Sequence, residues 1–315
     1  MMPPPQRQGV GSAHSKLILI GEHAVVYGQP AIALPFPLLN VTSTVENGNN
    51  GIYLTSEFFT GPISNLPNQL KGIGMCIFET LDKLQAPTKE LHIRLVSNIP
   101  IGRGLGSSAA IAVAIVRSLF SYFEQKLSRQ TLMSLVHVAE TYAHGNPSGI
   151  DMACVSSTKP IWFEKGEEVV PIHLAQPLHL LVADTGRVGD TWSAVTAVRK
   201  SYLSKNTGTK ASIERLGALT IKARENLAGD QSMELGRLLN AAHEELVNIG
   251  VSDEGLDQLV KAAQQAGALG AKLTGGGRGG CILALAHNQN HAEELSQALL
   301  DVGAQQTWAC TLSSE

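Results

Sequence analysis

The chain has 315 residues, about two domains' worth, which is enough to bury a sizeable core. Its composition, with 43% hydrophobic and 16% charged residues, is that of a globular protein and excludes collagen, coiled coil and extensive disorder. A formal net charge of -3 provides no broad positive field, so nucleic acid is not the expected ligand, whereas small anions can still bind at local sites.

Neither a membrane span nor an export signal is expected. The longest uninterrupted apolar run, residues 109–116, is eight residues long, whereas a spanning helix takes about 20. Prolines and polar residues occupy the N-terminal segment where a signal peptide has its apolar region, so the expected location is cytoplasmic. The four cysteines lie far apart without a C-x-x-C pair, which argues against a zinc ribbon and a disulfide framework.

The first half of the chain is expected to begin with strands and continue with helices. Short apolar runs at 16–20 and 24–27 predict strands split by Gly21-Glu22-His23, and residues 40–60 are rich in strand-forming residues with turn signals. Apolar residues at intervals of three and four then predict helices, and alternation predicts one strand between the first two of them. These helices are expected at 73–84, 107–126 and 130–144, and the strand at 91–96.

A composition shift near 160–178, where lysine, glycine and proline recur, indicates a domain boundary. The predicted domains are 1–170 and 171–315. Strands mixed with helices in both halves indicate two α+β domains. In the second half, patterning predicts strands at 178–183 and 306–312 and helices around 209–228, 231–249, 253–267 and 290–302.

A glycine-rich loop, Pro100-Ile-Gly-Arg-Gly-Leu-Gly-Ser-Ser-Ala-Ala110, runs directly into an alanine-rich helix, with Ser107 or Ser108 expected as its cap. The glycines allow positive φ and close approach to a ligand, and the free N–H groups and dipole of the first helical turn favour an anion. The spacing is neither G-x-x-x-x-G-K-[ST] nor G-x-G-x-x-G. The segment therefore predicts a phosphate site, with an ordinary serine-capped helix as the alternative.

A second glycine cluster lies in Lys272-Leu-Thr-Gly-Gly-Gly-Arg-Gly-Gly-Cys281, between two strand-like segments. Each glycine loses much conformational entropy on folding, so packing alone explains five of them poorly. A loop whose backbone presses against a ligand is the favoured interpretation. A flexible hairpin connection is the alternative.

Two carboxylates and one charged strand stand out among the polar residues. Glu140 falls at the margin of the apolar stripe of its helix, where a carboxylate is expected to meet a metal, a cation or a salt-bridge partner. Asp151 ends the turn-rich Gly145-Asn-Pro-Ser-Gly-Ile-Asp151, placed either to cap the next short helix or to face a cleft. Near the N-terminus, Lys16 and Glu22-His23 put charged groups at both ends of one β element.

Together these segments resemble the motifs of the GHMP kinases, the small-molecule kinases named for galactokinase, homoserine kinase, mevalonate kinase and phosphomevalonate kinase. Residues 16–28, 100–110 and 272–280 resemble the N-terminal motif, the phosphate loop P-x-x-x-G-L-G-S-S-A-A and the C-terminal glycine motif, in family order. Within the family, G-E-H-A-V-V-x-G and N-P-S-G-I-D are most similar to the mevalonate kinase branch. The resemblance implies an N-terminal domain like domain 2 of ribosomal protein S5, a ferredoxin-like C-terminal domain and an active site in the cleft between them.

The resemblance also implies an activity, the MgATP-dependent phosphorylation of the 5-hydroxyl of mevalonate in isoprenoid biosynthesis. It implies Asp151 as the catalytic base, Lys16 as the cation that keeps this carboxylate ionised, and Ser108 and Glu140 as Mg²⁺ ligands, in keeping with the preference of magnesium for oxygen donors. The residues implied to bind ATP are Pro100, Gly102, Gly104, Leu105, Gly106, Ser107, Ser108 and Ala109, with Gly275, Gly276, Gly277 and Gly279 of the C-terminal motif. The residues implied to contact mevalonate are Lys16, Glu22, His23, Asp151 and Thr191.

Two positions depart from the family pattern. Gly189 stands where an arginine is expected two residues before Thr191, with Arg187 as a substitute, and Arg278 stands where many relatives have alanine, asparagine or histidine. Two alternatives stay open: another GHMP kinase, such as a phosphomevalonate kinase, and a catalytically inactive regulator that binds nucleotide. A dinucleotide-binding oxidoreductase is disfavoured, because its strand, G-x-G-x-x-G turn and following acidic residue are absent. The family is also compatible with a homodimer.

Overall fold

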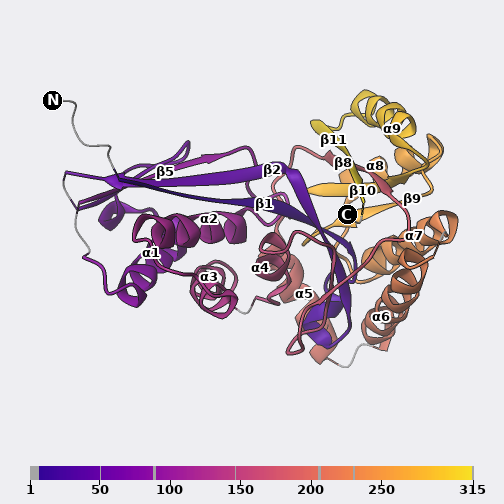
Figure 1. The fold of residues 1–315 in the computed structure, drawn as a ribbon. Helices are drawn as coiled ribbons and strands as arrows, with labels where there is room; N and C mark the ends of the chain where they lie inside the picture. Colours follow the sequence, from indigo (N-terminus) through magenta and orange to yellow (C-terminus); the bar gives the residue numbers. More distant parts are fainter. Residues whose placement is uncertain are drawn as a thin grey trace. The chain divides into compact units, whose positions relative to one another are not determined.

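The structure, a computed structural model, describes residues 7–49, 51–87, 90–145, 147–204, 207–229 and 231–313 (Figure 1). Within these ranges the chain mixes helices with two sheets, which confirms the predicted α+β class. Contacts between Cα atoms group the chain into two compact units, each assembled from several segments. Unit 1 comprises Met1–Ser15, Leu39–Ile99 and Gly106–Ser156, and unit 2 comprises Lys16–Leu38, Pro100–Leu105 and Ser157–Glu315. The division into domains at residue 170 stays a prediction.

Unit 1 packs helices against a sheet. Two long strands, β1 and β2, pair with each other and contribute residues to both units, and in unit 1 the part of β2 from Val41 to Asn47 pairs antiparallel with β5. The strands are β1 (Gln8–Ile20), β2 (Ala31–Asn47), β3 (Ile52–Thr55), β4 (Thr60–Pro62) and β5 (Leu91–Ser97). The helices are α1 (Lys71–Lys83), α2 (Ser107–Tyr122), α3 (Arg129–His144) and α4 (Ile150–Val155), with the 3-10 turns η2 (Ile63–Asn65) and η3 (Asn68–Leu70).

The helices of unit 1 are held by apolar side chains and by close backbone contact. α1, α2 and α3 pack against one another, and α4 packs against α2 and α3. α2 is buried along almost its whole length because its apolar residues run all round the helix. Gly11 lets β1 lie directly on this helix, since a Cβ there would clash with the backbone of Ala114 and Ser118. Figure 1 shows α1 and α2 alongside the long strands.

Unit 2 contains a four-stranded antiparallel sheet in the order β11-β8-β10-β9. α7, α8 and α9 pack against it, α6 packs against α7, and α5 packs against α6. The sheet strands are β8 (Leu178–Asp184), β9 (Gly270–Thr274), β10 (Cys281–Ala286) and β11 (Gln306–Leu312). The helices are α5 (Thr191–Leu203), α6 (Thr207–Leu227), α7 (Ser232–Asn248), α8 (Glu254–Gln265) and α9 (Gln289–Asp301). The first residues of β2 also pair with β6 (Ile161–Phe163), which pairs with β7 (Val170–Pro171).

Most elements expected from periodicity are present, but one strand assignment was wrong and helix α5 was not predicted. The run 24–27 is a 3-10 helix, η1 (Ala24–Tyr27), rather than a strand, because Gly21 and Gly28 take positive φ and Val26 N–H bonds to the carbonyl of His23 within the turn. α5 was not expected; only two of its side chains, Ala194 and Val198, are buried.

None of the helices in the described ranges combines the length and apolar character that a membrane crossing takes. The four cysteines are buried thiols rather than members of a disulfide. Burial raises the pKa of both Cys76 and Cys310 to about 12, so these thiols stay protonated and pack as small apolar groups.

Candidate active site

The predicted phosphate loop and the C-terminal glycine motif lie against each other in unit 2. Pro100–Leu105 belongs to this unit, and residues 275–280 form the turn between β9 and β10. A Cβ on Gly275 would lie 2.8 Å from the Cα of Gly104, and the two residues have φ of 86° and 76°. Both positions therefore require glycine for backbone conformation and for close approach. The cluster is a tightly packed loop rather than a flexible hairpin connection.

A third segment, residues 185–190 between β8 and α5, is hydrogen-bonded to both glycine loops. The N–H of Gly189 donates to the carbonyl of Gly102 at 2.7 Å, and the N–H of Asp190 donates to the carbonyl of Arg278 at 3.2 Å. A side chain on Gly189 would begin 3.2 Å from the carbonyl oxygen of Gly277. A side chain at position 189 would therefore require its neighbours to shift by a few tenths of an ångström.

Lys16 connects β1 to the phosphate loop. The side chain is 2% exposed, its Nζ donates to the carbonyl of Gly104 at 3.0 Å, and its backbone N–H donates to the carbonyl of Leu105 at 3.1 Å. Two residues later, Ile18 exchanges hydrogen bonds of 3.1 and 3.0 Å with the hydroxyl of Thr274, which precedes the second glycine loop. One strand therefore anchors both loops, and it places a buried ammonium at the first of them.

Glu22 forms a buried ion pair with Lys272 of β9. The exposed fractions of their side chains are 1% and 0%, and the Lys272 ammonium also donates to the carbonyl of Leu273 at 2.6 Å. Burial raises the pKa of Glu22 and lowers the pKa of Lys272, and the attraction between the two charges opposes both shifts. The predicted substrate residue Glu22 therefore has its carboxylate on Lys272, a partner that sequence reasoning missed.

His23 reaches the second glycine loop. Its ring is 7% exposed, and its Nε2 lies 3.0 Å from the carbonyl oxygen of Gly276. A carbonyl only accepts, so Nε2 carries the proton and Nδ1 of the neutral ring is the acceptor. Burial lowers the pKa of His23 to about 4. The imidazole is therefore neutral near pH 7, with Nδ1 available to a hydroxyl or another donor.

This depressed pKa predicts a loss of stability in acid. His23 titrates near 6.5 when unfolded and about 4 when folded, so stability that is present above pH 6.5 is lost as the pH falls towards 4. Between pH 7 and pH 5 the loss from this residue amounts to about 2 kcal/mol. Urea unfolding of wild type and His23→Gln at both pH values measures the difference. Equal losses in the two proteins would contradict the assignment.

Thr191 and Arg278 join the start of α5 to the second glycine loop. Thr191 is the first residue of α5, and a Cβ on Gly276 would clash with its side chain. The Nη1 of Arg278 donates to the Ser193 hydroxyl at 2.8 Å, and its Nε and Nη2 donate to the carbonyl of Gly250 at 3.3 Å. The guanidinium of Arg278 is therefore bound by unit 2 itself, which gives this departure from the family pattern a structural role.

The other predicted residues lie in unit 1. Ser107 and Ser108 are the first two residues of α2, whose N-cap is Gly106 with φ 74° and no side-chain cap bond, so the prediction of a serine cap was wrong. Glycine takes this left-handed conformation at far lower energy than serine. Both serine side chains are half-buried in the first turn, while Ala109 is buried.

Glu140 and Asp151 lie on the two helices that follow. Glu140 is 2% exposed on α3, which packs against α2. Asp151 is the second residue of α4, whose N-cap is Gly149, so capping is not its role. Its side chain is partly exposed in the first turn, where the helix dipole favours a negative charge. Asn146 of the same motif lies outside the described residues.

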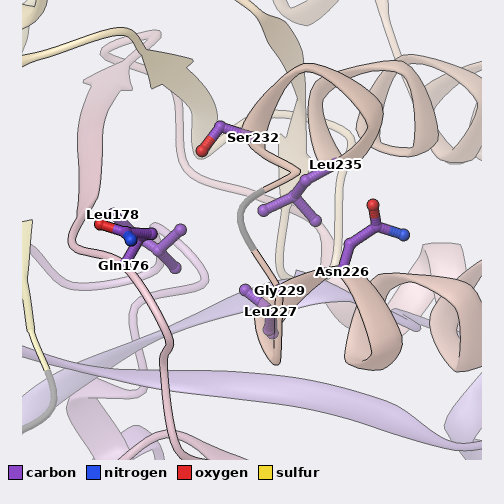
Figure 2. Close-up of a pocket in the computed structure, with 7 residues that line it drawn as sticks. All are labelled: Gln176, Leu178, Asn226, Leu227, Gly229, Ser232 and Leu235. Carbon is purple, nitrogen blue, oxygen red and sulfur yellow. The ribbon is translucent and has the colours of Figure 1, made fainter.

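A small cavity elsewhere in unit 2 contains none of the predicted catalytic residues. Figure 2 shows its lining, which comes from the segment before β8, the end of α6 and the start of α7. Its volume of about 10 Å³ has room for no more than one water molecule. Asn226, one of the lining residues, has a buried Oδ1 without a hydrogen-bond partner among the described residues. The lining residues are Gln176, Leu178, Asn226, Leu227, Gly229, Ser232 and Leu235.

Two models of one protein family match the chain. The model of the GHMP kinases N terminal domain matches residues 73–158, and the model described as GHMP kinases C terminal matches residues 223–305. The chain belongs to the GHMP kinases. As a GHMP kinase it is an ATP-dependent phosphotransferase, and the two matched regions cover more than half of its length.

Individual relatives agree with this assignment. This GHMP kinase is 34% identical to a mevalonate kinase of Pyrococcus furiosus, over 89% of this chain and 90% of the relative, and 34% identical to a mevalonate kinase of Aeropyrum pernix, over 89% of each. Among solved structures, L. major mevalonate kinase in complex with R-mevalonate matches with a TM-score of 0.85, 27% identity and coverage of 100% and 99%.

Proposed function

We propose that this GHMP kinase transfers the γ-phosphoryl group of ATP to the 5-hydroxyl of mevalonate and forms 5-phosphomevalonate. The observation that carries the proposal is the meeting of both glycine loops with Lys16 and His23 in unit 2. The mevalonate kinases that are 31–34% identical to the chain support the choice of substrate. The complex of L. major mevalonate kinase with R-mevalonate supports it as well.

ATP is proposed to bind through the backbone of the phosphate loop. Phosphoryl transfer depends mainly on positioning and on stabilisation of negative charge. The N–H groups of residues 106–109, from the Gly106 cap into the first turn of α2, have no intrahelical partner, and with the helix dipole they favour phosphate oxygens. The buried ammonium of Lys16 donates to the carbonyl of Gly104 and adds a fixed positive charge to the part of the loop in unit 2. These N–H groups and the ammonium of Lys16 are proposed to stabilise the negative charge of the phosphoryl group in the transition state of its transfer.

The alcohol is proposed to be handled by Asp151, His23 and Thr191. Asp151 orients the 5-hydroxyl and accepts its proton as the oxygen attacks phosphorus. His23 offers the neutral Nδ1 as a hydrogen-bond acceptor because its Nε2–H is committed to Gly276. Thr191 presents a hydroxyl at the start of α5, fixed by its packing on Gly276. Glu22, the residue before His23, has its carboxylate on Lys272, so its proposed role is to fix this turn of the chain beside the substrate.

Magnesium is proposed to be held by Ser108 and Glu140. These residues offer one hydroxyl and one carboxylate on two helices that pack against each other, and magnesium prefers hard oxygen donors and completes its shell with phosphate oxygens and water. No group of three or more histidine, cysteine or acidic side chains suited to a metal occurs within the described ranges. This sparse donor set fits a metal that arrives with the nucleotide. When bound, it neutralises charge on the phosphates.

Glu140→Gln is expected to raise the Mg²⁺ concentration for half-maximal activity about ten-fold or more, because a neutral amide replaces a charged ligand. Glu79→Gln on the exposed face of α1 is the matched control in the same unit, and we expect it to behave like wild type. The measurement is the initial rate against Mg²⁺ at fixed ATP. Coincident curves for the two variants would remove Glu140 from the metal site.

The assay that tests the proposed function measures ADP release with MgATP against mevalonate, phosphomevalonate, galactose, homoserine and isopentenyl phosphate. Turnover on mevalonate alone is the expected result. Turnover on another alcohol or phosphate would support the kinase activity but replace mevalonate as the assigned substrate. Tight ATP binding without turnover on any of them would favour the inactive regulator.

A further inference from the structure

Arg103, the residue between the first two glycines of the phosphate loop, is fixed to the end of β8. Its Nε donates to Oδ2 of Asp184 at 2.8 Å, and its Nη2 donates to the carbonyl of Gly186 at 2.9 Å. The side chains of Arg103 and Asp184 are 15% and 5% exposed. The other oxygen of Asp184 accepts from the N–H of Gly186 at 2.8 Å, so both oxygens of this carboxylate are engaged.

Asp184 is a rigid anchor. It is the last residue of β8, a central strand of the four-stranded sheet, and its backbone pairs with Cys281 of β10 on one side and Gln306 of β11 on the other. Arg103, in contrast, lies in a loop with glycine on either side, which has little stiffness of its own. The hydrogen bonds of the Arg103 guanidinium to Asp184 and Gly186 therefore limit the conformations that the phosphate loop can adopt.

The same anchor extends to the second glycine loop. Thr185, next to Asp184, donates from both its N–H and its hydroxyl to the carbonyl of Gly280, at 3.0 and 2.8 Å. A Cβ on Gly280 would lie 2.9 Å from the carbonyl oxygen of Arg103. The two consecutive residues Asp184 and Thr185 thus hold one glycine loop each, and the loops touch.

A role in orientation explains the pair better than a role in stability. A buried ion pair has a net effect on stability close to zero, because desolvation of the charges offsets their attraction. The fork of an arginine fixes direction as well as distance when it makes two hydrogen bonds. Arg103 donates both side-chain hydrogen bonds to the segment 184–186. These two bonds restrict the backbone of the phosphate loop to one orientation relative to the sheet.

We propose that Arg103 and Asp184 form a positioning pair that holds the phosphate loop in the conformation that binds the triphosphate of ATP. The inference rests on the proposed use of this loop for ATP. It adds two residues that neither touch the alcohol nor take part in proton transfer. Their loss is expected to weaken nucleotide binding and to change the rate constant of the chemical step much less.

The test measures nucleotide affinity directly, by calorimetry with ATP and Mg²⁺ in the absence of any alcohol, and KM for ATP and kcat in the assay. We expect Arg103→Met and Asp184→Asn each to raise the Kd for ATP about 10- to 100-fold, because a loop that is no longer held in its binding conformation must be ordered when the nucleotide binds. Arg103→Lys keeps the charge but cannot make both hydrogen bonds, so it should fall between these variants and wild type.

A double-mutant cycle separates a pair from two independent residues. If Arg103 acts through Asp184, the double variant Arg103→Met/Asp184→Asn binds ATP about as weakly as either single variant. Arg215→Met is the matched control, because it removes an arginine that is ion-paired with Glu245 at the surface of α6. Its Kd should equal that of wild type.

Two outcomes would overturn the proposal: a Kd within two-fold of wild type for both single variants, or additive effects in the double variant. Thermal unfolding of each variant identifies any that fails to fold. If Arg103→Met or Asp184→Asn does not fold, the Kd of Arg103→Lys for ATP is compared with that of wild type instead. The affinity measurements need no phosphate acceptor. If the enzyme did not phosphorylate mevalonate, only the activity assay would show it. The effect of the Arg103 variants on the Kd for ATP could still be interpreted.

Discussion

Replacement of Asp151 by asparagine is expected to lower kcat by about three powers of ten. The amide has nearly the shape of the carboxylate, but it cannot accept the proton of the attacking hydroxyl. Asp151 is neither the cap of α4 nor part of its buried face, so the variant should fold normally. Initial rates with MgATP and mevalonate measure the effect, and calorimetry with ATP alone should give a Kd close to that of wild type.

Asp82→Asn is the matched control for this substitution. Asp82 is exposed near the end of α1 in the same unit, and the same chemical change there should leave kcat unaltered. A kcat for Asp151→Asn within ten-fold of that of the control would mean that the carboxylate orients the alcohol without serving as the base. A loss of ATP affinity equal to the loss of rate would instead place Asp151 at the nucleotide.

The second large effect concerns the buried pair of Glu22 and Lys272. Lys272→Met removes the ammonium and leaves a carboxylate that is 1% exposed, with its Oε2 already lacking a hydrogen-bond partner among the described residues. Breaking such a pair on one side is expected to lower the free energy of unfolding by about 3–5 kcal/mol. The midpoint of urea unfolding at pH 7 measures the loss.

The double variant Glu22→Gln/Lys272→Met should recover part of this stability, since no buried charge remains. Lys261→Met on the exposed face of α8 provides the control, with a change within about 0.5 kcal/mol. If Lys272→Met unfolded at the same urea concentration as Lys261→Met, the pair would have to be either solvated or uncharged in the folded protein.

The sequence predicted those elements whose pattern is local. α3 and α8 carry apolar residues at helical spacing because burial of one face imposes that pattern, and β11 was expected at its observed bounds. α2 was expected from its long apolar run, which is buried on all sides. α5 was missed although Trp192, Val195 and Val198 are spaced three apart, and only two of its side chains, Ala194 and Val198, are buried in the structure. The run 24–27 was too short for periodicity to separate a strand from a 3-10 turn.

The partners of the site residues could not be predicted because they are distant in sequence. Lys272 meets Glu22 across 250 positions and Arg103 meets Asp184 across 81, and nothing near either residue specifies the other. A lysine inside the apolar strand β9 was the one available signal, since a buried charge demands an opposite charge. The two glycine loops were predicted from the sequence because several glycines within a few residues are a local feature. Their entropic cost on folding requires a reason such as positive φ or close backbone approach.

The segmented build of the two units has a consequence for synthesis on the ribosome. The chain passes from one unit to the other after Ser15, Leu38, Ile99, Leu105 and Ser156. Unit 1 has all of its segments once residue 156 has emerged, whereas Lys16–Leu38 and Pro100–Leu105 must wait for the segment from Ser157 onward before unit 2 can form. No single cut yields either unit as a continuous fragment. The two glycine loops of unit 2, at 100–105 and 275–280, therefore come together only after unit 1 has all of its segments.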